Sequence, residues 1–138
     1  MNFQIVDGPI DLPAVYARAC DDAFGAVVLF AGVVRKRSDD DREVTGLSYE
    51  AYADAAVAEM ENIAAEVRDR WNPCRIAMTH RTGDVAIGEP SVAVAVGTPH
   101  RAQAFAACEY AMTELKARVP VWKKEHYADG SAQWHGAP

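Results

Sequence analysis

An almost continuous apolar run, GAVVLFAGVV at residues 25–34, constrains the fold more than any other segment of this 138-residue sequence. Its length and its β-branched content are typical of a β-strand whose two faces are both covered by protein. Arg35 follows the run directly. We therefore expect a buried strand that places a cation at its exit.

Two further segments have apolar residues at three- and four-residue steps, which is the spacing of an amphipathic helix. The first runs from residue 54 to residue 71 and is ended by Pro73. The second runs from about residue 99 to about residue 118 and is stopped by Pro120. A shorter helix is expected to open at Asp11, with Pro13 in its first turn. The sequence thus predicts three helices.

Short apolar or alternating runs predict further strands. They lie at residues 3–6, 44–52, 75–81, 91–96 and 121–127. The order β-α-β-β-α-β-β-α-β predicts an α+β fold in which helices pack on a mixed or antiparallel sheet, with 75–81 and 91–96 as a hairpin. Because 138 residues, half of them hydrophobic, can bury a core without disulfides or metals, we expect one domain over residues 1–138.

The charge and the N-terminus limit the classes of partner. A formal net charge of −6 gives no general attraction to nucleic acid or anionic lipid, so an anionic ligand would need a local basic cluster. The first residues, MNFQIVDGPIDLP, lack the basic start and apolar core of a secretory signal, and no apolar stretch reaches membrane-spanning length. We expect a cytoplasmic protein with no nucleic-acid or membrane partner.

The three cysteines, Cys20, Cys74 and Cys108, are odd in number and far apart. No C-x-x-C motif and no histidine at ligand spacing accompanies them, so we expect neither a disulfide framework nor a metal site. Structural thiols are the favoured interpretation, and a nucleophile or persulfide carrier is the alternative.

The best local signal for a binding site is the segment Gly97-Thr98-Pro99-His100-Arg101. Thr98 can cap a helix, Pro99 fits its first position, and His100 and Arg101 then fall in the first turn. Cations there oppose the helix dipole, an arrangement that suits a bound anion such as phosphate. The alternative is that Arg101 points into solvent and His100 caps a strand end.

Lysines form the second candidate cluster. Lys116 lies near the end of the second long helix, and Lys123 and Lys124 follow in the last strand, where alternation sends them to opposite faces. A lysine can act as a general acid or base, or stabilise a developing anion. Solvated surface lysines are the alternative. His80 and Arg81, at a strand end, are expected to have a structural or supporting role.

Five ordered motifs between Gly25 and Trp134 resemble the family of large, catalytic subunits of molybdopterin synthase. They are GAVV with GVVR (25–35), LSYEAY (47–52), HRTG with GE (80–89), HR with AF (100–105) and LKARVPVWKKE (115–125). The resemblance implies a hammerhead-like α/β fold with a small additional β subdomain.

The resemblance also implies an activity and its partners. A small ubiquitin-like subunit would insert its C-terminal thiocarboxylate into a pocket, and sulfur would pass to cyclic pyranopterin monophosphate to form the dithiolene of molybdopterin. No cofactor is expected, because the partner carries the sulfur, and no cysteine of this chain then needs to be catalytic. The implied assembly is a homodimer with one small subunit at each outer end, a heterotetramer.

Site residues are implied position by position. Lys116 and Lys123 match the family's catalytic lysines. The anionic substrate pocket matches at Arg35, His100 and Arg101, with Lys124 as a neighbouring basic position. In this interpretation the pocket cations hold the cyclic phosphate while the two lysines assist thiocarboxylate attack and loss of oxygen.

One departure from the family and two other functions stay open. Many relatives continue past the region of Trp134 with a charged tail that gives a basic residue to the neighbouring subunit, whereas this sequence ends at Pro138. We expect that residue to be absent, with Lys36 or Arg37 as a possible substitute. The alternatives are a non-catalytic phosphate- or nucleotide-binding module and a scaffold that only binds a ubiquitin-like partner.

Overall fold

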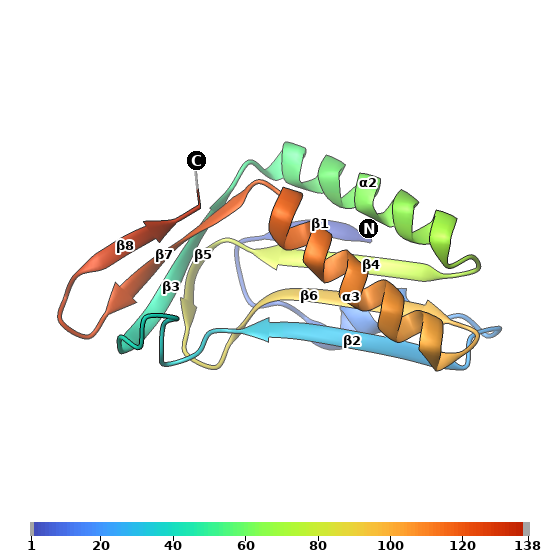
Figure 1. Cartoon of the computed structure of the whole chain (residues 1–138), viewed down its shortest axis with the longest axis horizontal. Helices are drawn as coiled ribbons and strands as arrows, with labels where there is room; N and C mark the ends of the chain where they lie inside the picture. The colour runs from blue at the N-terminus through green and yellow to red at the C-terminus, as the bar shows by residue number, and fades with distance from the viewer. Residues whose placement is uncertain (1, 137–138) are drawn as a thin grey trace.

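A computed structural model describes residues 2–136, so Ala137 and Pro138, the end of the tail considered above, lie outside the described residues. Over these described residues the chain forms three helices and eight strands (Figure 1). In order they are β1 (Phe3–Val6), α1 (Leu12–Arg18), β2 (Ala26–Val33), β3 (Val44–Ala51), α2 (Ala53–Arg70), β4 (Arg75–Arg81), β5 (Gly83–Ala86), β6 (Pro90–Thr98), α3 (Arg101–Arg118), β7 (Val121–Tyr127) and β8 (Ala132–His135).

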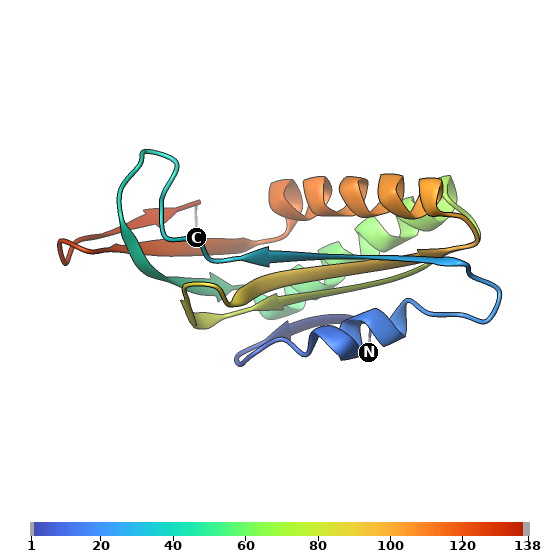
Figure 2. The same cartoon turned by 90° about the horizontal axis from the view of Figure 1, so that it is seen from below.

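The strands form two four-stranded sheets, with orders β1-β4-β6-β2 and β5-β3-β7-β8. Only β1 and β4 pair in parallel among the described strands, and the other pairs are antiparallel. Helices α2 and α3 cover one face of the first sheet and α1 covers the other, while the second sheet extends beyond the helices (Figures 1 and 2). The predicted α+β class, the hairpin pairing of β4 with β6 and the additional β region are confirmed.

The two central strands of the first sheet are buried on both faces, and the two faces carry side chains of different size. Toward α2 and α3 they present Ile76, Met78, Val94 and Val96, packed with Met60, Ile63 and Val67. Toward α1 they present Ala77, Ala93 and Ala95, packed with Val15 and Ala19. Small side chains on the second face allow the short helix α1 to approach the sheet closely.

Gly97 of β6 is the point where this approach is tightest. A Cβ atom at Gly97 would lie 1.9 Å from the carbonyl oxygen of Ala19, at the end of α1. We predict that Gly97→Ala lowers the free energy of unfolding by about 3 kcal/mol, because backbone must move to relieve the overlap. The urea midpoint checks this against Gly8→Ala, whose added Cβ meets nothing within 4 Å; equal midpoints would contradict the prediction.

The expectation that residues 25–34 are covered on both faces is wrong for the isolated chain. β2 is an edge strand of the first sheet, and Leu29, Phe30 and Val33 are 36%, 41% and 55% exposed. An apolar run indicates that a strand is buried in the functional protein. It does not tell whether the same chain or a second chain buries it. The exposed apolar edge of β2 is therefore a candidate surface for contact with a second chain.

Two short strands and one helix boundary also differ from expectation. β5 (GDVA) and β8 (AQWH) were not expected, because neither has the apolar, β-branched character of the equally short β1 (FQIV). Helix α3 begins at Arg101, two residues later than expected, because Thr98 still belongs to β6 and its hydroxyl donates to the carbonyl of His100 at 2.7 Å. Thr98 is therefore the end of a strand and does not cap the helix. None of the helices described for residues 2–136 is both long and apolar enough to span a membrane.

Candidate functional site

A pocket of about 650 Å³ lies where the C-terminal end of α3 meets β7 and the loop of residues 34–43, here called the β2–β3 loop. Its ionisable lining comes from several elements: Arg35, Arg37, Asp39, Asp40, Tyr49, His80, Lys116, Lys123, Glu125 and His135. Apolar walls are supplied by residues such as Phe30, Met112 and Trp122. The pocket thus combines an apolar surface with converging charges, as ligand sites commonly do.

The structure brings Lys116 and Lys123 to this pocket from different elements. Lys116 is in the last turn of α3, where the helix dipole interacts favourably with a basic side chain. Lys123 is half-buried on β7, on the same face as Glu125. Lys124 points to the other face, with its Nζ 5.5 Å from the centre of the Trp134 ring, and does not line the pocket. Because neighbouring side chains of a strand point to opposite faces, Lys123 faces the pocket and Lys124 does not.

Arg35 also lines the pocket, one residue after the buried Val34 that follows β2. Its guanidinium forms an ion pair with Asp39 of the same loop, and the Arg35 side chain is 66% exposed. An exposed ion pair of this kind contributes little to stability and can be rearranged by an incoming anion. The cation expected at the strand exit thus lines the same pocket as both lysines.

His100 and Arg101 lie elsewhere in the chain. They stand at the N-terminal end of α3, whereas Lys116 stands at its C-terminal end (Figures 1 and 2). At about 1.5 Å per residue, this 18-residue helix is roughly 27 Å long. Both residues are exposed and neither lines the pocket. A single chain therefore does not unite all the residues that the sequence suggested for one site.

His80 contributes to the pocket, although the sequence suggested only a supporting role for it. It is 6% exposed and lines the pocket, while Arg81 turns toward Glu89 and the carbonyl of Asp84. His80 Nδ1 lies 2.9 Å from the carbonyl oxygen of Arg81, which can only accept, so Nδ1 carries the proton. Burial lowers the pKa of His80 and favours this neutral form.

Tyr49 and Glu125 are further pocket residues that the sequence did not single out. The Tyr49 ring meets His80 edge-on at 5.0 Å between centroids, and burial raises the pKa of its phenol. Glu125 is 8% exposed, accepts a hydrogen bond from Tyr127 Oη at 3.1 Å and lies 2.5 Å from His135 Nε2. The alternation that selects Lys123 also places Glu125 on the same face of β7, so this signal was present in the sequence.

None of the three cysteines, which all lie within the described residues 2–136, lines the pocket. Cys108 is on the buried face of α3, and burial raises the pKa of its thiol to about 11. Burial also raises the pKa of Cys74. Both thiols therefore stay protonated near neutral pH and are poor nucleophiles. Among residues 2–136, no cluster of three or more His, Cys, Asp and Glu side chains is arranged to hold a metal ion.

The sequence profile of the MoaE protein family matches residues 5–118. Among curated proteins, the molybdopterin synthase catalytic subunit of a Nostoc species is 44% identical over 134 residues, which cover 96% of this chain and 81% of that relative. The molybdopterin synthase catalytic subunit of Bacillus subtilis is 40% identical over 135 residues, which cover 98% of this chain and 85% of the relative.

Solved structures with the same fold carry related names. Molybdopterin synthase from Staphylococcus aureus superposes with a TM-score of 0.94 at 34% identity, covering 99% of this chain and 98% of the other. A chain from the protein–protein complex of subunits 1 and 2 of molybdopterin-converting factor from Helicobacter pylori gives a TM-score of 0.79 at 26% identity, covering 97% and 90%.

Proposed function

Since the chain belongs to the MoaE protein family, we propose that its 650 Å³ pocket is the sulfur-transfer site of a molybdopterin synthase catalytic subunit. The chain acts in molybdenum cofactor biosynthesis as a sulfur-transferring enzyme. The observation that carries the assignment of the site is the convergence of Lys116, Lys123 and Arg35, from three separate segments, on one pocket.

The chemistry that these residues support follows from their charges. Arg35 offers a planar guanidinium to the cyclic phosphate of cyclic pyranopterin monophosphate. The thiocarboxylate sulfur of the small subunit attacks the substrate carbon, an oxygen leaves that carbon, and a thioester then joins the substrate to the small subunit. Water hydrolyses the acyl carbon–sulfur bond of this thioester, so that the sulfur stays on the substrate and the small subunit leaves as a carboxylate. The ammonium groups of Lys116 and Lys123 stabilise the negative charge that develops and supply a proton to the departing oxygen.

The sulfur donor is a small ubiquitin-like subunit, and the enzyme needs no cofactor of its own. The Helicobacter pylori relative, solved as a complex of two subunits, supports a partner of this kind. The thiocarboxylate tail has to reach the lysines, and the pocket is open to the exterior at its loop side, where the Arg35 side chain is exposed. Sulfur therefore passes from partner to substrate without a cysteine intermediate on this chain.

A cysteine-free variant tests this route. We predict that the triple variant Cys20→Ser, Cys74→Ser, Cys108→Ala retains sulfur transfer within about twofold of wild type, because no thiol lines the pocket and the Cys108 thiol is protonated. Single-turnover product formation is the measurement, with the fraction of folded protein checked by circular dichroism. A folded variant that forms no product would show that a cysteine carries the sulfur.

Homodimerisation accounts for two otherwise separate observations. Leu29, Phe30 and Val33 on the edge strand β2, together with Phe105 at 62% exposure on α3, leave apolar surface uncovered. Phe30 and Val33 also line the pocket, so a second copy that covers this edge lies beside the pocket. The second copy then supplies its His100 and Arg101 to the pocket of the first copy. The first copy is unable to place its own His100 and Arg101 in that pocket.

We further propose that the whole chain acts as one domain in the cytoplasm.

The test of the function is a single-turnover reaction of this protein with a thiocarboxylated small subunit and cyclic pyranopterin monophosphate. Formation of molybdopterin supports the assignment. Tight binding of the small subunit without product would instead identify a scaffold, and binding of phosphate without product would identify a non-catalytic anion-binding module.

A further inference from the structure

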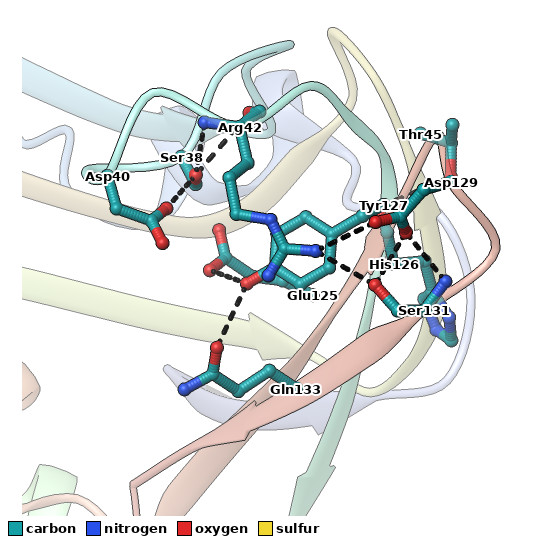
Figure 3. Close-up of polar contacts among 10 residues, drawn as sticks. All are labelled: Ser38, Asp40, Arg42, Thr45, Glu125, His126, Tyr127, Asp129, Ser131 and Gln133. Carbon is teal, nitrogen blue, oxygen red and sulfur yellow. Dashed lines mark hydrogen bonds and ion pairs between the residues drawn. The ribbon is translucent and has the colours of Figure 1, made fainter.

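The β2–β3 loop forms one wall of the pocket, and Arg42 connects this wall to the opposite one (Figure 3). The loop carries Arg35, which lines the pocket. Across from it stands the β7–β8 hairpin, which carries Lys123 and Glu125. The distance between the two walls decides whether the cations of both can reach one substrate at the same time.

The backbone of Arg42 is fixed within the loop. Its N–H donates to Ser38 Oγ at 3.0 Å, and its carbonyl accepts from the N–H of Ser38 at 2.9 Å. Ser38 is 6% exposed, and its hydroxyl also hydrogen-bonds Asp40, which lines the pocket. A displacement of Arg42 is therefore transmitted to the loop residues that face the pocket.

The side chain of Arg42 is fixed to the hairpin at three points. Its guanidinium carbon lies 3.5 Å from the centre of the Tyr127 ring. One guanidinium nitrogen donates to Ser131 Oγ at 2.8 Å and to Asp129 Oδ2 at 3.2 Å (Figure 3). Hydrogen bonds from Ser131, followed by the charge of Arg42, hold the pKa of Asp129 below its usual value, so Asp129 is ionised. Only an arginine can stack a planar cation on the Tyr127 ring and at the same time hydrogen-bond Asp129 and Ser131. The ammonium group of a lysine has no planar face to stack.

The contacts continue from Tyr127 into the pocket. Tyr127 is buried, with 4% of its surface exposed, and its hydroxyl donates to Glu125 Oε1 at 3.1 Å. Burial, together with this carboxylate, raises the pKa of Tyr127 and keeps its proton in place for that bond. Glu125 stands two residues from Lys123, on the same face of the strand. Arg42 is thus connected to one wall through its backbone and to the other through Tyr127.

We propose that Arg42 is a positioning residue of the sulfur-transfer site: by joining the β2–β3 loop to the β7–β8 hairpin, it sets the spacing of Arg35 from Lys123 across the pocket. This inference rests on the proposed function for its catalytic consequence. Its structural part, that Arg42 orders the loop, is independent of that function. An ordinary exposed ion pair would change neither loop order nor substrate use by a measurable amount.

The test compares Arg42→Ala and Arg42→Lys with the same two changes at Arg75. Arg75 is a matched control because it also joins two segments, through Asp21 at 3.5 Å and the Cys20 carbonyl at 3.1 Å, but does not line the pocket. In the full chain, we expect faster backbone hydrogen exchange over residues 35–42 in both Arg42 variants. With the small subunit present, we expect KM for cyclic pyranopterin monophosphate to rise about tenfold or more in both, with a smaller change in kcat.

Each result decides a separate part of the inference. Unchanged exchange in the Arg42 variants would show that the loop does not depend on Arg42. Faster exchange with unchanged KM would show that the loop position is irrelevant to substrate use, and full activity of Arg42→Lys would reduce the role of Arg42 to charge alone; both overturn the proposal. An absence of turnover in wild-type protein would instead defeat the proposed function, and the exchange data would still decide whether Arg42 orders the loop.

Discussion

Replacing Lys116 or Lys123 with alanine is expected to slow single-turnover formation of molybdopterin by a factor of about 10²–10³. In the proposed reaction each ammonium stands where charge develops during loss of oxygen, and among residues 2–136 no other lysine lines the pocket. Stability should change little, because Lys116 is exposed and Lys123 is half-buried without an ion-pair partner among residues 2–136. The measurement is the rate of product formation with excess thiocarboxylated small subunit.

The neighbouring lysine provides the control for this experiment. Lys124 has the same charge and lies in the same strand, but it points to the other face and stands over Trp134. Lys124→Ala should therefore retain at least about half of the wild-type rate. Equal losses in all three variants would indicate a general effect of positive charge on partner docking and would remove the catalytic role from Lys116 and Lys123.

Mixed dimers are expected to recover activity that neither parent variant has. Lys116→Ala and Arg101→Ala homodimers should both be nearly inactive. If each site uses Lys116 of one copy and Arg101 of the other, a heterodimer of the two variants contains one site with both lesions and one intact site. It should show about half of the wild-type turnover per dimer, because the two sites act independently. Differently tagged copies, purified as heterodimers, provide the measurement.

The geometry of α3 is the reason for this expectation. The helix separates Arg101 from Lys116 by nearly its whole length, so one copy is unable to bring both to its own pocket. A heterodimer as inactive as its parents would show that Arg101 is needed in the same copy that supplies Lys116, and so does not act across the dimer. A fully active Arg101→Ala homodimer would remove Arg101 from the site altogether.

Most of the secondary structure could be predicted from local patterns. Helix α2 and strands β4 and β7 follow from apolar spacing and from proline positions, which depend only on neighbours in the sequence. Strands β5 and β8 were missed because these short segments become strands only by pairing with β3 and β7, which lie elsewhere in the sequence. The start of α3 was misplaced because pairing with β2 keeps Thr98 in the sheet.

Some features of the candidate site were also predictable from local sequence, and others were not. Alternation along residues 121–127 was enough to predict that Lys123 and Lys124 face opposite sides, and the motifs were enough to suggest Lys116 and Arg35. Nothing local indicated that His80 and Tyr49 meet Lys116 in one pocket, since these residues come from three different elements. The separation of Arg101 from Lys116, in contrast, already followed from the helix predicted at residues 99–118, because the two residues lie near its opposite ends.

The sequence by itself determined the class of fold, the family and the chemical types available for sulfur transfer, because propensity, periodicity and motif order are properties of neighbouring residues. The tertiary structure alone decided which cations share a pocket, that β2 leaves an apolar edge exposed, and that Arg42 joins the loop to the hairpin. These features depend on strand order and on contacts between segments up to 89 residues apart, as between Arg42 and Ser131. Such long-range contacts are fixed only when the sheets and helices pack together.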